Sequence, residues 1–370
     1  MIPYLILILF PVLFPLVYYR PKRGGASLLT EGLVEKRTEM AVALFFLGLF
    51  AMLALRDITV GIDLVEYKKI FVECGKTSFT GLSKLRWEIG YTIFNKLCYT
   101  ISKEYRILLI AVAIITIVPI YQLYSREKKN SFLLIVLFVN MPCFVIVFSG
   151  LRQAIAVSIG VIAYMAIEEK KHFRGVLLIL LASTFHMSAF ILLLLFPAFY
   201  WKIKVRDLIY IIPAMAAIYV VRKPLLSFII SFLPEKYIEF YGEIRDTGAY
   251  GMMILFLIFS AFSFVVLNEE SMTQSDYCMR NILLIATVLQ LFVPIHGLIQ
   301  RASYYFLIFV PVALLTVVRV PSRQWKEISN IAIVIMSGFF FIFFFYTAIF
   351  SDNNLLDVFP YKFFWSGRGW

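Results

Sequence analysis

Apolar runs of about 20 residues recur along the whole chain, and they limit the possible fold more than any other feature. Each run is long enough to cross the hydrocarbon core of a membrane as an α-helix. A membrane β-barrel would show short alternating strands, whereas these runs are continuous. Hydrophobic residues make up 61% of the chain, well above the roughly half that is typical of soluble domains. We therefore expect an all-α, polytopic integral membrane protein with residues 1–370 in one membrane domain.

These runs predict ten regular spans and one irregular stretch, about 11–12 transmembrane segments in total. The spans cover residues 4–19, 40–55, 107–124, 132–148, 154–167, 207–221, 252–267, 282–295, 303–318 and 331–350. Residues 173–200 are too few for two ordinary spans, so a broken or re-entrant helix pair with its break at 183–188 is expected there. One tilted span is the alternative. The first run lacks a basic start and a small-residue cleavage site, which favours a retained span over a signal peptide.

The distribution of Lys and Arg orients these spans, because short basic loops stay on the cytoplasmic side. Five such loops carry Arg20, Lys22, Arg23, Lys36, Arg37, Arg126, Lys128, Lys129, Lys170, Lys171, Arg174, Lys202, Lys204, Arg206, Arg319, Arg323 and Lys326. The net charge of +12 is then explained by topology, and no nucleic-acid partner is expected. Most of the remaining polar residues, including Arg152 and Gln153 between two spans, fall on the outer side.

Two long outer loops are predicted, at residues 56–105 and 222–250. The first contains apolar residues at loose helical spacing, which predicts an amphipathic helix on the outer membrane surface; they are Trp87, Ile89, Tyr91, Ile93, Phe94, Leu97 and Ile101. Aromatic rings mixed with carboxylates suit a sugar ligand, because rings stack on sugar faces and carboxylates accept hydroxyl hydrogen bonds. Membrane anchoring by the same aromatic residues is the alternative.

Several common catalytic motifs are missing from the sequence. It contains no GxxxxGK[ST] phosphate loop, no GxGxxG turn, no HExxH zinc motif and no GxSxG elbow. The four cysteines show no metal-binding spacing, although Cys74 and Cys98 share an outer loop and could pair. We expect no cofactor and no metal, and a reaction driven by a gradient or by an activated lipid-borne donor.

A series of short motifs resembles the EpsG family of Wzy-type polysaccharide polymerases. The motifs are LRD at 55–57, GID at 61–63 with Tyr67, WEIGY at 87–91, SGLRQAIA at 149–156, FHMSA at 185–189, and Arg301 with YYF at 304–306. They cover the chain from roughly Arg56 to Phe306, and PYKFF at 360–364 also fits. Each motif is weak alone, and the resemblance depends on their order and their shared outer placement.

The resemblance implies a glycosyl transfer reaction at the periplasmic or outer face of the bacterial inner (cytoplasmic) membrane. Such polymerases move a growing glycan from undecaprenyl diphosphate to the non-reducing end of a lipid-linked repeat unit, which yields O-antigen, capsule or exopolysaccharide. The implied partners are undecaprenyl-diphosphate-linked oligosaccharides, membrane lipids, and a chain-length regulator and a flippase of the same pathway. An O-antigen ligase and a lipid-linked oligosaccharide flippase are the alternatives.

This reaction needs cations at the diphosphate leaving group and a base at the attacking hydroxyl. Arg152 and Arg301 are predicted to hold the diphosphate, with Arg56 as a further candidate, because the planar guanidinium can bind two phosphate oxygens. The further substrate-binding candidates are Gln153, Tyr67 and Tyr304. Each arginine could instead be an interfacial anchor that reaches toward lipid headgroups.

His186 is the leading candidate for the catalytic base, because it marks the predicted break beside three hydroxyl side chains. Asp63 and Glu88 compete for the same role, since a carboxylate can also accept the proton. His296 is a weaker candidate, and His172 falls in a predicted cytoplasmic loop.

Overall fold

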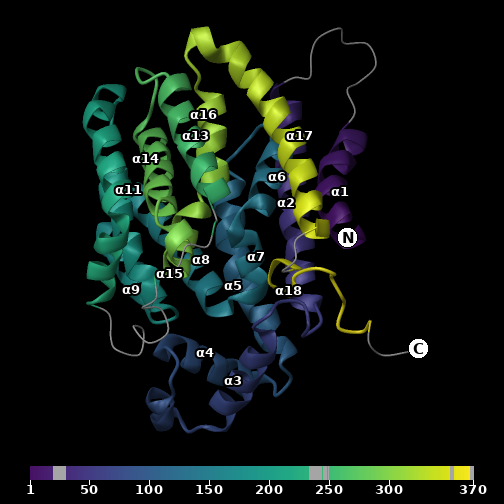
Figure 1. Cartoon of the computed structure of the whole chain (residues 1–370). Helices are drawn as coiled ribbons and strands as arrows, with labels where there is room; N and C mark the ends of the chain where they lie inside the picture. Colours follow the sequence, from purple (N-terminus) through teal and green to yellow (C-terminus); the bar gives the residue numbers. More distant parts are fainter. Residues whose placement is uncertain (20–30, 233–243, 245–247, 249, 351–353, 367–370) are drawn as a thin grey trace. The chain divides into compact units, whose positions relative to one another are not determined.

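The computed structural model describes residues 1–19, 31–232, 244, 248, 250–350 and 354–366 (Figure 1). These residues are almost entirely helical, and their only β-type pairings are two isolated bridges. By length and composition, six described helices could cross a membrane, and two bent helix pairs raise the number to eight. Four shorter apolar helices accompany them: Ile2–Tyr18, His172–Ser183, Met187–Tyr200 and Tyr250–Val266. The predicted all-α polytopic membrane fold is confirmed, and each predicted span overlaps one of these segments.

The chain forms two compact units, one of Met1–Phe190 with Ile333–Trp370 and one of Ile191–Ala332. Some sequence-based predictions concern residues outside the described part. These are the basic residues Arg20, Lys22 and Arg23, residues 233–243, 245–247 and 249 of the outer loop 222–250, and residues 351–353 and 367–370 of the tail.

The first unit contains most of the candidate membrane helices and the segment that joins two of them, which is predicted to lie on the outer side. Its membrane helices are α1 (Ile2–Tyr18), α2 (Glu31–Leu55), α5 (Arg106–Tyr124), α6 (Ser131–Asn140), α7 (Pro142–Ser149), α8 (Leu151–Glu168) and α9 (His172–Ser183). Between α2 and α5 the chain forms α3 (Leu64–Lys76), the 3-10 helix η1 (Phe79–Lys84) and α4 (Ile89–Ile101) (Figure 1). The long helix α17 (Lys326–Phe350) returns the chain to this unit, and the short helix α18 (Asn354–Asp357) follows it.

Helix α4 occupies the place of the predicted amphipathic helix, but its two faces differ from the expected ones. Tyr91 and Cys98 are buried, and α4 packs against α3. One apolar stripe at helical spacing remains exposed: Ile89, Ile93, Leu97 and Ile101. Tyr91 was therefore assigned to the wrong face, since burial against protein and exposure to lipid both favour apolar side chains. That the exposed stripe lies on a membrane surface stays a prediction.

Two predicted spans are bent where a proline begins the second helix. α6 and α7 meet at an angle of 62°, and Met141 between them is extended because Pro142 disfavours a helical residue before it. α15 (Gly297–Leu307) and α16 (Val310–Arg319) meet at 49°, with Pro311 in the first turn of α16. Neither bend is predicted from the sequence, because the apolar pattern continues through each of them.

The predicted break within residues 173–200 is confirmed. α9 ends at Ser183, and after Thr184, Phe185 and His186 the chain continues as the 3-10 helix η2 (Met187–Leu194) and α10 (Leu195–Tyr200). The turn 184–186 is held by backbone hydrogen bonds from Phe185 and His186 to the carbonyl of Ala182, both at 3.0 Å. The helix thus ends at a defined position, one turn before the polar side chains of FHMSA.

One other expectation is wrong, and the possible pairing of Cys74 with Cys98 is not found. The outer loop predicted to begin at Arg222 starts later, because α11 (Leu208–Ile230) continues through Arg222 and buries it. Cys74 and Cys98 do not pair; both are free and buried.

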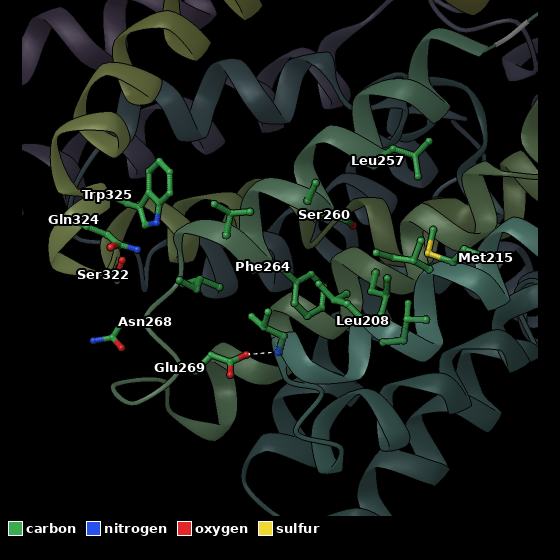
Figure 2. A pocket seen from close by; sticks show the side chains of 17 residues that line it. Leu208, Met215, Leu257, Ser260, Phe264, Asn268, Glu269, Ser322, Gln324 and Trp325 are labelled. Atoms are coloured by element: carbon green, nitrogen blue, oxygen red, sulfur yellow. Dashed lines mark hydrogen bonds between the residues drawn. The ribbon is translucent and has the colours of Figure 1, made fainter.

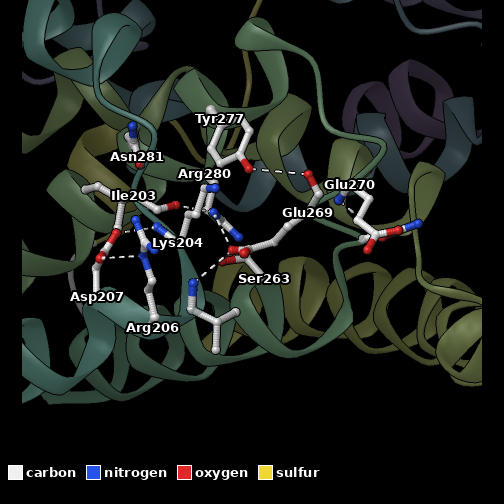
Figure 3. Close-up of polar contacts among 12 residues, drawn as sticks. Ile203, Lys204, Arg206, Asp207, Ser263, Glu269, Glu270, Tyr277, Arg280 and Asn281 are labelled. Atoms are coloured by element: carbon white, nitrogen blue, oxygen red, sulfur yellow. Dashed lines mark hydrogen bonds and ion pairs between the residues drawn. The ribbon is translucent and has the colours of Figure 1, made fainter.

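The second unit is organised around α14 (Gln274–Gln290), which packs against α10, α13 (Tyr250–Val266), α15 and α16. Figure 3 shows the polar contacts at its first turns. The Arg280 guanidinium contacts Glu269 at 3.0 Å and donates to the carbonyl of Ile203. Asn281 donates to the carbonyls of Ala198 and Trp201 at 2.9 and 2.7 Å. These contacts fix the chain before α11, including the basic segment that the sequence places in the cytoplasm.

Candidate functional site

The candidate site forms where the start of α4 meets the turn that follows α9. The backbone N–H of Gly90 donates to the carbonyl of Thr184 at 2.9 Å, and the rings of Phe94 and Phe185 make an edge contact with 6.1 Å between centroids. A side chain at Gly90 would bring a Cβ within 2.2 Å of the Thr184 hydroxyl oxygen. The glycine of WEIGY is therefore required for this close approach, which brings WEIGY and FHMSA together.

Glu88 and Arg152 form an ion pair at this contact. Arg152 Nη1 donates to Glu88 Oε2, and the guanidinium carbon lies 4.8 Å from the centre of the Trp87 ring. The side chains are 21% and 19% exposed, so the pair is open to a ligand without being fully solvated. A charge-assisted hydrogen bond in such a setting is stronger than a surface ion pair. Arg152 is thus held by a carboxylate and an aromatic ring and does not project freely toward lipid.

Tyr67 of α3 extends the cluster. Its phenol lies near the Arg152 guanidinium, and its ring meets that of Tyr91 edge-on, with 5.7 Å between centroids. Burial raises the pKa of Tyr67 above the usual value for a phenol, although nearby Arg152 lowers it. The phenol is therefore protonated at neutral pH and can itself donate a hydrogen bond.

His186 lies beside the same carboxylate. Its Nδ1 is 4.0 Å from Glu88 Oε1 and 3.3 Å from the hydroxyl oxygen of Ser188. The side chain is 19% exposed, so it can be reached from solvent. Four of the residues proposed from sequence therefore meet at one place: Glu88 lies between Arg152 and His186, and Tyr67 lies near Arg152.

Arg56 has a different setting. It is only 1% exposed, its Nη1 lies 3.5 Å from the carbonyl of Val147, and its guanidinium carbon is 5.5 Å from the centre of the Phe148 ring. Burial lowers the pKa of Arg56 to about 10, which leaves it charged at neutral pH. These contacts are with protein groups, and a substrate would have to displace them.

The LRD and GID motifs hold the C-terminal tail in place. The N–H groups of Asp57 and Gly61 donate to the carbonyls of Lys362 and Asp357, both at 2.9 Å. Gly61 has φ of +116°, a conformation that favours glycine. Asp63 precedes α3 with an exposed side chain, and its charge raises the pKa of Tyr67, so it lies near the cluster. Gln153 is 3% exposed and faces the interior.

The remaining candidates, Arg301, Tyr304 and His296, belong to the second unit. Arg301 is exposed on α15, and Tyr304 is buried. His296 caps the start of α15, where its Nδ1 accepts from the N–H of Leu298 at 3.1 Å. This hydrogen bond gives His296 a structural role.

Sequence reasoning missed three residues with notable settings. Trp87 was assigned to a membrane-facing stripe but stacks against Arg152. Arg106 opens α5 and donates to the carbonyls of Ala54 and Arg56, both at 2.9 Å. Arg222 is buried in the second unit, where it donates to the carbonyl of Leu291 at 3.0 Å. Arg106 could have been selected from the sequence, because it is a charged residue at the end of a predicted span, as Arg152 is.

The second unit also contains an apolar pocket of about 710 Å³ (Figure 2). Leu208, Met215, Leu257 and Phe264 line it, and Asn268, Glu269, Ser322, Gln324 and Trp325 gather at one end of the view. The Glu269 carboxylate forms an ion pair with Arg280 and accepts a hydrogen bond from the N–H of Val205 at 2.9 Å. The lining suits a lipid chain, and it includes none of the catalytic or substrate-binding residues proposed from sequence. Within the described residues, no group of three or more His, Cys, Asp or Glu is placed to hold a metal ion.

Comparison with known proteins gives one match. The model of the EpsG family matches residues 40–363 of the 370. No curated protein and no solved structure matches the chain. The matched range includes the Glu88, Arg152 and His186 cluster as well as Arg301 and Tyr304.

Proposed function

The chain belongs to the EpsG family, which is associated with polysaccharide-polymerase-like membrane proteins, and we propose that it is itself a glycosyltransferase that polymerises lipid-linked repeat units. The donor is a glycan on a polyprenyl diphosphate such as undecaprenyl diphosphate. The acceptor is a second lipid-linked repeat unit. The reaction takes place at the outer face of the bacterial inner membrane, where the orientation of the basic loops puts residues 56–105.

One observation carries this proposal: the Glu88 carboxylate contacts Arg152 through one oxygen and lies 4.0 Å from His186 through the other. A cation for the leaving group and a proton acceptor for the nucleophile are the two requirements of glycosyl transfer from a diphosphate. Arg152 can act as the cation and His186 as the proton acceptor, and both lie next to the Glu88 carboxylate.

In the proposed reaction, the acceptor hydroxyl oxygen forms a bond to the anomeric carbon of the donor, and the bond from that carbon to the diphosphate oxygen breaks. Arg152 stabilises the negative charge that develops on the departing diphosphate, helped by the protonated Tyr67 phenol. The hydroxyl proton passes to His186 or to Glu88. Polyprenyl diphosphate leaves, and the acceptor has grown by the transferred glycan.

The ion pair between Glu88 and Arg152 also suggests how the site is prepared. In the free protein the carboxylate neutralises the guanidinium, so no uncompensated charge is left in a half-buried place. A bound diphosphate competes for Arg152 and frees Glu88 to act on His186 or on the acceptor. Arg301 and Tyr304 remain proposed substrate contacts from the second unit, and Gln153 a proposed partner of Arg152. The contacts of Arg56 favour a structural role.

The test is an elongation assay with the full-length protein in lipid nanodiscs, supplied only with polyprenyl-diphosphate-linked repeat units. A polymerase lengthens them into a ladder of products. A ligase needs a different acceptor and a flippase makes no new bond, so unchanged repeats would overturn the proposal. Glu88→Gln and His186→Ala should each lower the rate strongly. His172→Ala is the matched control, because His172 is exposed at the opposite end of α9.

A further inference from the structure

A pocket of the first unit, about 770 Å³ in volume and partly lined by charged residues, has no role in the mechanism above. Its walls come from α3, the loop before α5, the first turns of α5 and the C-terminal tail. The lining residues that matter here are Lys68, Lys103, Arg106, Phe364, Ile107 and Ile110. Tyr67, the neighbour of Lys68 in α3, is not among its lining residues and instead lies near Arg152. The pocket and the Arg152 cluster are therefore separate sites that share α3.

The charge of the lining favours an anion. Lys68, Lys103 and Arg106 face two acids, Asp57 and Glu104. Asp57 already accepts hydrogen bonds from the N–H and the hydroxyl of Thr59 at 3.0 and 2.9 Å, which occupies one of its oxygens. These hydrogen bonds leave the charge of Asp57 in place, so three cations face two carboxylates and the lining carries a net charge of +1.

The cations differ in how firmly they are held. The Arg106 guanidinium donates to two backbone carbonyls and lies 3.9 Å from the centre of the Phe364 ring, so it is fixed in the wall. Lys68 and Lys103 are exposed at the rim, where flexible ammonium groups can close on a ligand. A fixed cation with two mobile ones suits a ligand that carries several negative oxygens, as a diphosphate does.

The other part of the lining is apolar and includes the start of a candidate membrane span. Ile107 and Ile110 belong to the first turns of α5, a candidate membrane span that starts at Arg106. Phe71 and Val72 of α3 also line the pocket. An anion bound to the three cations could therefore carry an alkyl chain that continues into the lipid along α5. The chemical class that fits is a phosphate or diphosphate ester of a long-chain lipid.

We propose that this pocket binds the diphosphate of the acceptor, the second polyprenyl-diphosphate-linked substrate. The inference rests on the proposed function. In that reaction the donor diphosphate is at the reacting carbon, beside Arg152. The acceptor reacts at the sugar end farthest from its own lipid, so its diphosphate needs a separate cationic site at the membrane surface. The pocket beside α3 supplies one without using any residue of the reaction centre.

Native mass spectrometry of the full-length protein with undecaprenyl diphosphate tests this directly. The wild type should bind two molecules. K68Q/K103Q should bind one, with the affinity for the second lowered by at least about tenfold, because two charged contacts are removed. K69Q/K84Q is the matched control, since both lysines are exposed on the same outer segment, outside the pocket, and Lys69 pairs with Glu66 at 3.2 Å. Two bound molecules in K68Q/K103Q, or only one in the wild type, would overturn the inference.

Two further measurements distinguish a specific acceptor site from a general phospholipid site and from a site that acts on the chemical step. Phosphatidylglycerol at equal concentration should not displace the second molecule; displacement would show a general phospholipid site and overturn the proposal. In the elongation assay, K68Q/K103Q should raise KM about tenfold and leave kcat unchanged, because the pocket binds substrate away from the reacting atoms. A fall in kcat with unchanged KM would contradict it. If the proposed function itself is wrong, neither the wild type nor any variant will elongate the repeats. That result differs from a failure of the acceptor-site proposal, in which the wild type still elongates them.

Discussion

Arg152, at the start of α8, donates to Glu88, which precedes α4 and lies 64 residues earlier in the chain. Neither side chain is fully buried or fully exposed. An arginine that only anchors a helix would point toward lipid headgroups, whereas this one is held by a carboxylate and an indole ring and lies near the Tyr67 phenol. The arrangement predicts that the shape of the side chain matters as well as its charge.

Arg152→Lys should lower kcat by about 100-fold, because the ammonium group cannot contact Glu88, Tyr67 and a diphosphate in the planar geometry of a guanidinium. The measurement is initial elongation rate at saturating substrate, with the amount of inserted protein determined in parallel. Arg126→Lys is the control, since Arg126 also pairs with a glutamate, Glu168, but belongs to a basic loop. Near-normal activity in Arg152→Lys would identify Arg152 as an anchor.

Glu88→Gln and His186→Ala should not have additive effects. If Glu88 acts through His186, each single change lowers the rate by about 100-fold, and the double variant is scarcely slower than the worse single variant. Rates from the two single variants and the double variant decide this. Losses that multiply would show that the two residues act independently, and the 4.0 Å approach would then be a packing contact only.

Much of this site was predictable, and the reasons for the exceptions are physical. Hydropathy locates the spans because a membrane helix must be apolar along its length, and a charge such as Arg152 at a span mouth stands out for the same reason. The pairing of Glu88 with Arg152 was not predictable, because it depends on where α4 docks, and a single sequence carries no distance between residues so far apart. Trp87 was misplaced since an aromatic at helical spacing looks the same whether it faces lipid or a guanidinium. Proline, in contrast, could have located the bend at Met141, because the residue before a proline is rarely helical.

Gly90→Ala should disturb the site without removing any of its polar side chains. The new methyl would lie 2.2 Å from the Thr184 hydroxyl oxygen, which forces α4 away from the turn after α9. We expect a loss of about 1–3 kcal/mol in the stability of this contact and a corresponding fall in activity. Thermal unfolding and elongation rate should change together.

Thr184→Ala in the Gly90→Ala background should restore part of the thermal stability and part of the elongation rate, since it removes the hydroxyl oxygen that clashes with the new methyl. Gly32→Ala is the control, because nothing lies within 4 Å of the added atom. No rescue by Thr184→Ala would mean that the contacts it leaves at 2.9 Å, with the Thr184 Cβ and the Thr184 carbonyl oxygen, are enough to force α4 away.

Cys74 and Cys98 report on the packing of α3 against α4. Burial raises the pKa of each thiol to about 11. A raised thiol pKa means that the proton is retained over the neutral range, so at pH 8 only about one thiol in a thousand is the reactive thiolate. Alkylation by iodoacetamide should therefore be slow at pH 8 and should accelerate steadily as the pH approaches 11. An exposed cysteine introduced by Lys84→Cys serves as the reference, with an ordinary thiol pKa and fast labelling at pH 8. Labelling of Cys74 and Cys98 at the reference rate would show that α3 and α4 do not pack as described. The positions of Tyr67 and Glu88, which depend on these helices, would then also be in error.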